Sequence, residues 1–594
     1  MSRLSLPRRA HLAVLAIAGV LAACSASAPA EEADEASEDE LSTRGAVVDP
    51  TMPDVDAIAY ELDLAVDDTA RRESYNATLK GTYIATRDLD ELELDLEGTE
   101  IDDVKVGRRN AEHRREGSKL FVKLPAPVAK GKAFTTRIAY HGAVAQADGA
   151  NPNDFAAFGG FMVKQRNAEG RRIFTSLSWP SKARRWMPLR DHPRDGAMFA
   201  AKVTFPEKYT VLANGKKLGV TDNGDGTRTW RFESSSPMPT YDFHVSAYDA
   251  WNVKEGRASS GVPIATYRYA RSEQNAEQVY RDLPRALDFY ESAFGKYRFG
   301  TAAFIEEPIF GGGMEHASVV SMDETLFDGD PESRETAFHE LAHHWSGNLA
   351  RIRTWNDFWL SEGFTEYLTA RFIADHDGPE AEKRVLRGYM TAAFGAERYS
   401  AHPLRPADPE IDVLTIFDAT SYQKGALVMR MLEGIVGRET MTSFLRGWFD
   451  RHAFGAVTTE DLKKELEQAS GKDLGAFFAG FVYGSYHPEI KVTLAGAAGR
   501  QEIVVEQVQT KGPEAGFAFP LVVELASASG DKRRVTVDVR GRTARAPVPA
   551  GFEATALVVD PDEHLLGSVA CDANRACKEG FRCGSAAVAM CLPR

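Results

Sequence analysis

The chain has 594 residues, which is too long for one hydrophobic core, so several domains are expected. Its hydrophobic content of 43% and charged content of 26% are those of a soluble globular protein. The net charge of −15 argues against nucleic acid as a partner.

The N-terminus has the layout of an export signal. Arginines at positions 3, 8 and 9 precede an apolar run at residues 11–24, HLAVLAIAGVLAAC. This run is too short to make a convincing membrane span. We therefore predict a signal peptide over residues 1–24.

The end of this segment, LAAC, resembles the bacterial lipobox, in which the Cys becomes the first mature residue and carries lipid. This predicts lipidation of Cys24 and an exported bacterial lipoprotein of the cell envelope, at the outer membrane or facing the periplasm. The alternative is ordinary secretion, with cleavage after an A-x-A-like site such as ASA at residues 26–28.

An acidic linker is predicted over residues 25–45. Within it, the run EEADEASEDE at 31–40 carries seven acids, no base and no aromatic residue. Such a composition is typical of a disordered, solvated tether.

Residues 46–255 are predicted to form an N-terminal antiparallel β domain. Short alternating apolar runs recur between turn residues, as in IAYELDLAV at 58–66. The segments YTVLANGKKLGV at 209–220 and TDNGDGTRTWRFE at 221–233 place Asn-Gly and Asp-Gly between strand-like flanks. Both are β-hairpin signals.

The periodicity changes over residues 256–485. Strands are predicted around 301–307 and 317–322, and helical patterns then dominate to residue 482. This order indicates an α+β domain. Strands return over 486–568, enough for a C-terminal β-sandwich, so the predicted fold class is multidomain α+β.

The tail at residues 569–594 is rich in cysteine. It holds Cys571, Cys577, Cys583 and Cys591. Beyond an export signal, such crowding indicates two disulfides in a small stapled module, with three possible pairings. A zinc knuckle is the alternative, which oxidising export makes less favourable.

The segment FHELAHHWSGNL at 338–349 carries a metal-binding pattern. His339 and His343 lie one helical turn apart, so both imidazoles can face one ion. Glu340 lies about 100° around the helix, beside the ion, where a general base belongs. A catalytic zinc needs a third protein ligand, and Glu362 follows after eighteen residues on a second predicted helix.

These motifs resemble those of the M1 family of zinc aminopeptidases, gluzincins related to aminopeptidase N and leukotriene A4 hydrolase. The match is H-E-x-x-H, eighteen residues and then the Glu of W-L-x-E-G. The sequence GGME at 312–315 resembles the family's G-x-M-E-N motif, and YQKG at 422–425 resembles its Y-x-K-G motif. The resemblance covers most of residues 50–560.

The resemblance implies a thermolysin-like zinc peptidase domain over 256–485, with one Zn²⁺ per chain. It implies Glu340 as the catalytic base and Tyr422 as a donor to the oxyanion of the intermediate. Glu315 would bind the free α-amino group of the substrate. The implied metal ligands are His339, His343 and Glu362, and the implied substrate-binding loop is Gly312, Gly313, Met314 and Glu315.

The function implied is that of a zinc-dependent aminopeptidase, which removes N-terminal residues from peptides by metal-activated water attack. Its partners would be peptides with a free N-terminus and, through the lipid anchor, a membrane. One alternative is an M1-like hydrolase of a non-peptide substrate, an epoxide or an ester. Another is an inactive metal-binding scaffold lipoprotein, against which the intact Glu340 and Tyr422 argue.

The sequence departs from the family pattern in two places. His316 stands where the family has Asn, and the stretch TSLSWPSKAR at 175–184 offers only Ser and Pro where the family has a Gln or Glu as a second amine anchor. The large C-terminal helical domain of longer members has no counterpart, which favours a more open cleft and broader specificity. His344 and Glu366, beside the metal motif, are interpreted as residues without a role in the chemistry. For Glu366 the alternative is that it supports a metal ligand.

Overall fold

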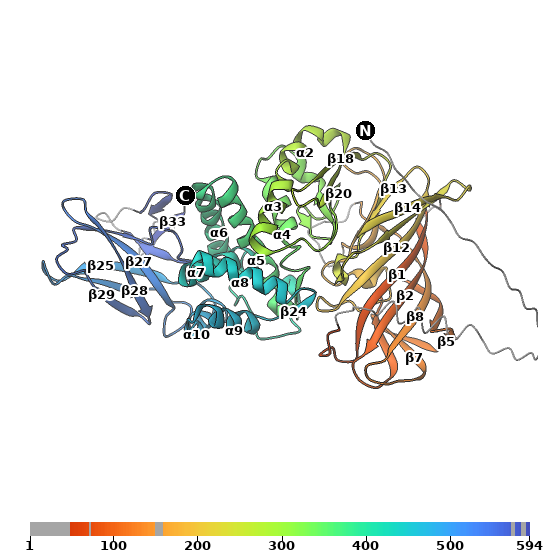
Figure 1. Cartoon of the computed structure of the whole chain (residues 1–594), viewed down its shortest axis with the longest axis horizontal. Coiled ribbons are helices and arrows are strands. Elements are labelled where there is room, and N and C mark those ends of the chain that lie inside the picture. The colour runs from red at the N-terminus through yellow and green to blue at the C-terminus, as the bar shows by residue number, and fades with distance from the viewer. Residues whose placement is uncertain (1–47, 70–72, 149–157, 572–576, 584–589, 594) are drawn as a thin grey trace, which may run out of the picture. The chain divides into compact units, whose positions relative to one another are not determined.

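Figure 1 shows the chain as a computed structural model. It describes residues 48–69, 73–148, 158–571, 577–583 and 590–593. The predicted signal peptide, the lipidation site Cys24 and the acidic linker lie outside the described residues. Within the parts of the chain that are described, no helix combines the length and the apolar character needed to cross a membrane.

The N-terminal region is built from β-strands, as predicted. Its largest sheet has the strand order β14-β15-β12-β1-β2-β8-β4-β5, with β16 beside β12. Buried and exposed residues alternate along β12, so one face of the sheet packs on the core. The strands are β1 (Val55–Asp67), β2 (Ser74–Ala85), β4 (Glu100–Val106), β5 (Arg109–Asn110), β8 (Ala133–Ala143), β12 (Gly196–Pro206), β14 (Lys216–Asp222), β15 (Thr227–Glu233) and β16 (Met238–Pro239).

Two smaller sheets complete this region, with the orders β13-β17-β11-β10-β9 and β3-β7-β6. Their strands are β3 (Leu89–Asp95), β6 (His113–Glu116), β7 (Lys119–Val128), β9 (Ala145–Gln146), β10 (Gly160–Lys164), β11 (Ile173–Leu177), β13 (Thr210–Ala213) and β17 (Val245–Tyr248). Most strand pairs are antiparallel, as expected, but β1 and β12 run parallel, with Ala59 opposite Met198. A parallel pair needs a long crossover, and the residues between these two strands supply it.

One of the two predicted hairpins is wrong. The segment at 221–233 does form a hairpin between β14 and β15, but β13 and β14, on either side of Asn214-Gly215, lie in different sheets. Asn214 is buried, and its amide donates to the carbonyl oxygens of Asp242 and Ala317, both at 2.9 Å. The Asn-Gly pair therefore turns the chain between two sheets and joins it to the next region instead of closing a hairpin.

The central region has a mixed sheet followed by helices, as predicted. The sheet order is β18-β19-β20-β22-β21. The predicted domain boundary after residue 255 falls inside β18, which pairs with β19, so this strand belongs to the central sheet. The strands are β18 (Asn252–Arg257), β19 (Pro263–Arg268), β20 (Ala302–Glu307), β21 (Gly313–Met314) and β22 (Val319–Asp323), and a parallel pair β23 (Ala350–Ile352) and β24 (Gly455–Val457) lies among the helices.

The helices of this region are α2 (Glu273–Tyr280), α3 (Leu283–Phe294), α4 (Ser333–Ala342), α5 (Trp359–His376), α6 (Pro379–Tyr399), α7 (Gly425–Val436), α8 (Arg438–Arg451), α9 (Thr459–Ser470) and α10 (Gly475–Phe481). Helix α9 shows how local sequence sets such bounds. The Thr458 side chain accepts from the backbone N–H of Asp461, the Asp461 carboxylate accepts from the backbone of Thr458, and Gly471 ends the helix in the left-handed conformation.

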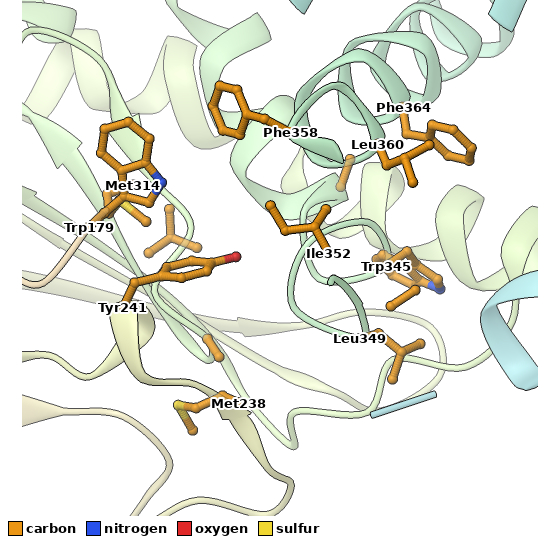
Figure 2. Close-up of a cluster of buried hydrophobic side chains, with 14 of the residues drawn as sticks. Trp179, Met238, Tyr241, Met314, Trp345, Leu349, Ile352, Phe358, Leu360 and Phe364 are labelled. Carbon is orange, nitrogen blue, oxygen red and sulfur yellow. The ribbon is translucent and has the colours of Figure 1, made fainter. Parts of the chain in front are cut away.

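The segment between α4 and α5 is anchored by apolar packing (Figure 2). Its side chains Trp345, Leu349 and Ile352 are at most 3% exposed. Side chains from the N-terminal region, Trp179, Met238 and Tyr241, lie in the same buried cluster. The segment that connects α4 to α5 therefore packs against side chains of both the N-terminal and the central region.

Beyond α10 the chain returns to strands, in two sheets with the orders β29-β26-β25-β31-β33-β32 and β28-β27-β30. The strands are β25 (Glu489–Ala495), β26 (Glu502–Gln507), β27 (Ala518–Ala526), β28 (Lys532–Arg540), β29 (Thr543–Pro547), β30 (Ala556–Val559), β31 (Ser568–Ala570), β32 (Phe581–Cys583) and β33 (Met590–Pro593). The tail cysteines form two disulfides, as predicted, and of the three possible pairings the structure has Cys571–Cys583 and Cys577–Cys591. All four sulfurs are thereby bonded, which excludes the zinc knuckle.

Candidate active site

Helices α4 and α5 bring the three predicted metal ligands together. The Nε2 atoms of His339 and His343 lie 2.9 Å apart. Glu362 Oε2 lies 3.3 Å from the first and 3.1 Å from the second. The two imidazoles come from consecutive turns of one helix and the carboxylate from the first turn of the next, so the predicted convergence is present.

The spacing of these atoms fits a zinc ion. Donor atoms bound tetrahedrally to zinc at 2.0–2.1 Å lie roughly 3.3 Å from one another. The three observed separations, 2.9, 3.1 and 3.3 Å, are close to that value. All three side chains are largely buried, as ligands of a catalytic metal at the base of a cavity must be.

Neighbouring groups orient both imidazoles. The Nδ1 of His343 donates to the carbonyl oxygen of Ser346 at 2.9 Å, which leaves its Nε2 lone pair for a metal. The Nδ1 of His339 faces Glu366 Oε2 at 3.6 Å. Glu366 is itself held by hydrogen bonds from Tyr389 and Gln423.

The interpretation of Glu366 as a residue without a role is therefore incomplete. Its carboxylate faces the ring of the predicted ligand His339. Its position one helical turn beyond Glu362 was the only signal in the sequence, and that spacing alone does not say which way the side chain faces. His344, in contrast, is buried away from the cavity, and its Nε2 accepts from the backbone N–H of Ser318 at 3.1 Å.

Interactions among the predicted ligands favour an ionised Glu362 and a protonated His343. Burial alone would raise the pKa of Glu362, but the imidazoles of His343 and His339 outweigh it and hold this pKa at about 2. Burial would lower the pKa of His343, but the Glu362 and Glu315 carboxylates raise it to about 9. A divalent cation would replace those protons, because it binds neutral imidazole and ionised carboxylate.

Glu340 lies beside the ligands in the place that a base requires. Oxygen atoms of Glu340 and Glu315 lie within 4.8 Å of a ring nitrogen of His343 and of each other. Burial, together with the charges of Glu315 and Glu362, raises the pKa of Glu340 to about 8. Gly313 makes room for it, since a Cβ at that position would collide with the Glu340 side chain.

The predicted substrate-binding loop, Gly312 to Glu315, lies along the same cavity. Its position is held by Asn348, whose amide donates to the backbone carbonyl of Glu315 at 2.7 Å. The Glu315 side chain is 5% exposed, and burial raises the pKa of its carboxyl. A buried carboxylate that lines the cavity favours a positively charged group there.

Tyr422 lines the same cavity, on a π-helical turn (Thr420–Lys424) that leads into α7. Its ring stacks on His339, with centroids 6.1 Å apart and planes 14° apart. The phenol makes no hydrogen bond to any other described residue. Burial and then the surrounding carboxylates raise its pKa well above the usual value, so the hydroxyl stays protonated and can donate.

Two glycines let the helices that carry Glu362 and Tyr422 meet. A Cβ on Gly363 would lie 2.7 Å from the Cα of Gly425, and a Cβ on Gly425 would lie 2.8 Å from the Cα of Gly363. These distances are closer than a methyl group allows, so α5 and α7 pack backbone to backbone. Gly363, which follows Glu362, and Gly425, which follows Lys424, therefore contact each other directly.

The cavity above these residues has a volume of about 540 Å³. Its described lining contains no Lys or Arg. It does contain seven carboxylates, those of Glu315, Glu332, Glu335, Glu340, Glu362, Glu366 and Asp418. Such a lining attracts a cationic group, such as the free amino terminus of a peptide.

Trp179 forms one wall of this cavity and comes from the N-terminal region. Its ring packs against Phe417 and Phe358, with centroids 5.0 and 6.0 Å away. It belongs to the stretch 175–184, which has only Ser and Pro near the place where the family has a Gln or Glu as its second amine anchor. The structure instead brings an indole to the cavity, a residue that the search for polar side chains overlooked.

Comparison with known proteins agrees with this geometry. Residues 57–241 match the model of the peptidase M1 N-terminal domain, and residues 280–481 match that of the peptidase family M1 domain. Aminopeptidase N of Streptomyces lividans is 28% identical over 427 residues, which cover 66% of this chain and 49% of that protein. Glutamyl aminopeptidase of Bos taurus is 26% identical over 406 residues, 64% of this chain and 42% of that protein.

A third relative aligns over more of the chain. Aminopeptidase 2, mitochondrial, of Saccharomyces cerevisiae is 25% identical over 532 residues, 84% of this chain and 54% of that protein. The chain thus spans about half the length of the curated relatives it matches.

Proposed function

Because this chain belongs to peptidase family M1, we propose that it is a zinc-dependent aminopeptidase that releases N-terminal residues from peptides. The observation that carries the proposal is the meeting of His339, His343 and Glu362 within 3.3 Å of one another at the base of an acidic cavity. When bound there, zinc would supply Lewis-acid polarisation of the scissile carbonyl and activation of a water.

The protein groups divide the remaining work. The Glu340 carboxylate takes a proton from the attacking water and returns it to the leaving nitrogen. The Tyr422 hydroxyl donates to the oxygen of the scissile carbonyl as negative charge develops on it. The Glu315 carboxylate pairs with the substrate's α-ammonium group, so the scissile bond is the first one along the peptide.

This assignment is tested by hydrolysis of aminoacyl chromogenic substrates. We expect wild-type protein to cleave the free but not the N-acetylated substrates, because only a free amine can pair with Glu315. Glu340→Gln should lower kcat by roughly 10²–10⁴-fold, as loss of a general base does. A chelator should abolish the activity and added Zn²⁺ should restore it.

The matched control is Glu332→Gln, which alters a carboxylate of the same cavity on an exposed part of the chain. It should retain most of the activity. Equal activity of Glu340→Gln and wild type, or equal cleavage of free and acetylated substrates, would reject the proposal. Zinc binding without hydrolysis of any of these substrates would do the same.

We further propose that the mature protein is an envelope lipoprotein tethered through Cys24 and the acidic linker. Three features of the N-terminal sequence support this proposal: the arginines, the apolar run that follows them and the LAAC ending.

We also infer that the central region is thermolysin-like and that the two C-terminal sheets form a β-sandwich. In support of the latter, Val505 of β26 and Val523 of β27 are both fully buried.

A further inference from the structure

A second cluster of metal-binding side chains lies outside the active-site cavity. His244 precedes β17 in the N-terminal region, Glu307 ends β20, and His316 lies between β21 and β22. One potential ligand atom from each lies within 4.8 Å of the others. All three side chains are 0% exposed.

Both imidazoles are held through Nδ1. The Nδ1 of His244 donates to the carbonyl oxygen of Ser176 at 2.9 Å, and the Nδ1 of His316 lies 2.8 Å from Ser321 Oγ. Each Nε2 is therefore the atom left for a ligand. The predicted zinc ligand His343 is held in the same way, and such a partner on the other ring nitrogen is typical of metal-binding histidines.

The atoms that face one another in this cluster are not otherwise satisfied. Neither Nε2 atom, nor either carboxylate oxygen of Glu307, makes a hydrogen bond within the described part of the chain. His244 Nε2 lies 3.3 Å from Glu307 Oε1. Buried polar atoms rarely remain in this state without a ligand or an ordered water.

The adjacent glutamate shows the contrast. Glu306 is equally buried, but its carboxylate accepts from the Ser272 hydroxyl at 2.6 Å and from the Tyr269 backbone N–H at 2.8 Å. Glu306 and Glu307, neighbours on one strand, thus differ in whether other described residues donate hydrogen bonds to their carboxylates. Only Glu307 is left facing two imidazoles.

Burial also favours the neutral form of both imidazoles. Burial lowers the pKa of His244, against the influence of Glu307. Burial, together with the neighbouring His244, lowers the pKa of His316 well below its usual value. Neutral rings beside a carboxylate form a nitrogen and oxygen donor set.

We propose that His244, Glu307 and His316 bind a second divalent metal ion, zinc or a transition metal of similar ligand preference. Two imidazole nitrogens and a bidentate carboxylate supply four donor atoms. The two rings stack, with centroids 4.2 Å and planes 20° apart. The ion joins the N-terminal region to the loop that carries Glu315, and its role is structural.

The test is the metal content of the full-length protein, which does not depend on the proposed activity. Wild-type protein is saturated with Zn²⁺, dialysed and measured by plasma mass spectrometry, and we expect two zinc ions per chain. His316→Asn should retain one, as should Glu362→Gln, which weakens the other site. The double variant should retain none, while Glu340→Gln should retain both and lose only hydrolysis.

Titration of the metal-free wild type with Co²⁺ provides a second measurement. Two binding steps with distinct visible spectra are expected, and His316→Asn or Glu307→Gln should remove one of them. One equivalent of metal in the wild type, unchanged by His316→Asn, overturns the proposal. The wild-type titration decides the matter even where a variant does not fold, because a single cobalt step is sufficient to reject a second site.

Discussion

At the scale of single residues, Trp179 adds an aromatic surface to the acidic cavity. Its indole stands in a wall otherwise rich in carboxylates and packs on Phe417 and Phe358. An aromatic face attracts cations and also provides an apolar surface for a side chain. We therefore expect it to contribute to binding the first residue of a substrate.

We expect Trp179→Ala to raise KM for aminoacyl substrates by roughly 5–30-fold, with a much smaller change in kcat. Trp179→Phe should restore most of the affinity, since it keeps an aromatic face. Steady-state kinetics on both variants, beside thermal unfolding curves, measures this. A loss confined to kcat, or an alanine variant with wild-type KM, would contradict a binding role.

At the scale of secondary-structure elements, the site depends on how closely α5 and α7 approach. Gly363 and Gly425 face each other, with no room for a methyl group on either. Glu362 immediately precedes one glycine, and Tyr422 lies within one turn of the other. The distance between the proposed metal ligand Glu362 and the proposed oxyanion donor Tyr422 is thus set by a contact between two backbones.

Gly363→Ala should push the two helices apart and lower kcat/KM by roughly 10²-fold, the order of loss expected when reacting groups shift by about 1 Å. Gly388→Ala is the matched control. Gly388 lies in the interior of α6 and a Cβ there would meet nothing within 4 Å, so this change should be neutral or slightly stabilising. Comparable activity of the two variants would show that the contact does not position the site.

At the scale of the whole molecule, the described N-terminal and central regions share buried contacts. Arg351, on β23, is 5% exposed, and its guanidinium donates to the backbone carbonyls of Arg194 and Phe454 at 3.2 and 2.6 Å. Asn214 reaches the carbonyl of Ala317, and Lys164 pairs with Glu324 at 2.7 Å. The N-terminal region therefore belongs to the framework of the active site.

The predicted tether concerns the whole molecule as well. In a bacterial host, the full-length chain should partition into the detergent phase of a Triton X-114 extract, and its mature N-terminus should be a lipid-modified Cys24. Cys24→Ser should move the protein to the aqueous phase without loss of peptidase activity, because Cys24 is not among the residues proposed for catalysis or substrate binding. A mature wild-type N-terminus following residue 28, without lipid, would instead support ordinary secretion.

Much of the site could be read from the sequence because its signals are local. A spacing of four residues places His339 and His343 on one face of a helix, wherever that helix lies. Strand and helix patterns likewise predicted the order of the β and α regions along the chain. Crowded cysteines predicted two disulfides, although the pairing needed the fold.

Tertiary structure alone decided which distant segments meet. Trp179 entering the cavity, Glu366 facing His339, Asn214 joining two regions and His316 stacking on His244 all depend on packing between separate elements. Periodicity states which face of an element is buried, but not what it is buried against. Which surfaces pack against each other depends on how all the sheets and helices fit together. No short stretch of sequence contains that information.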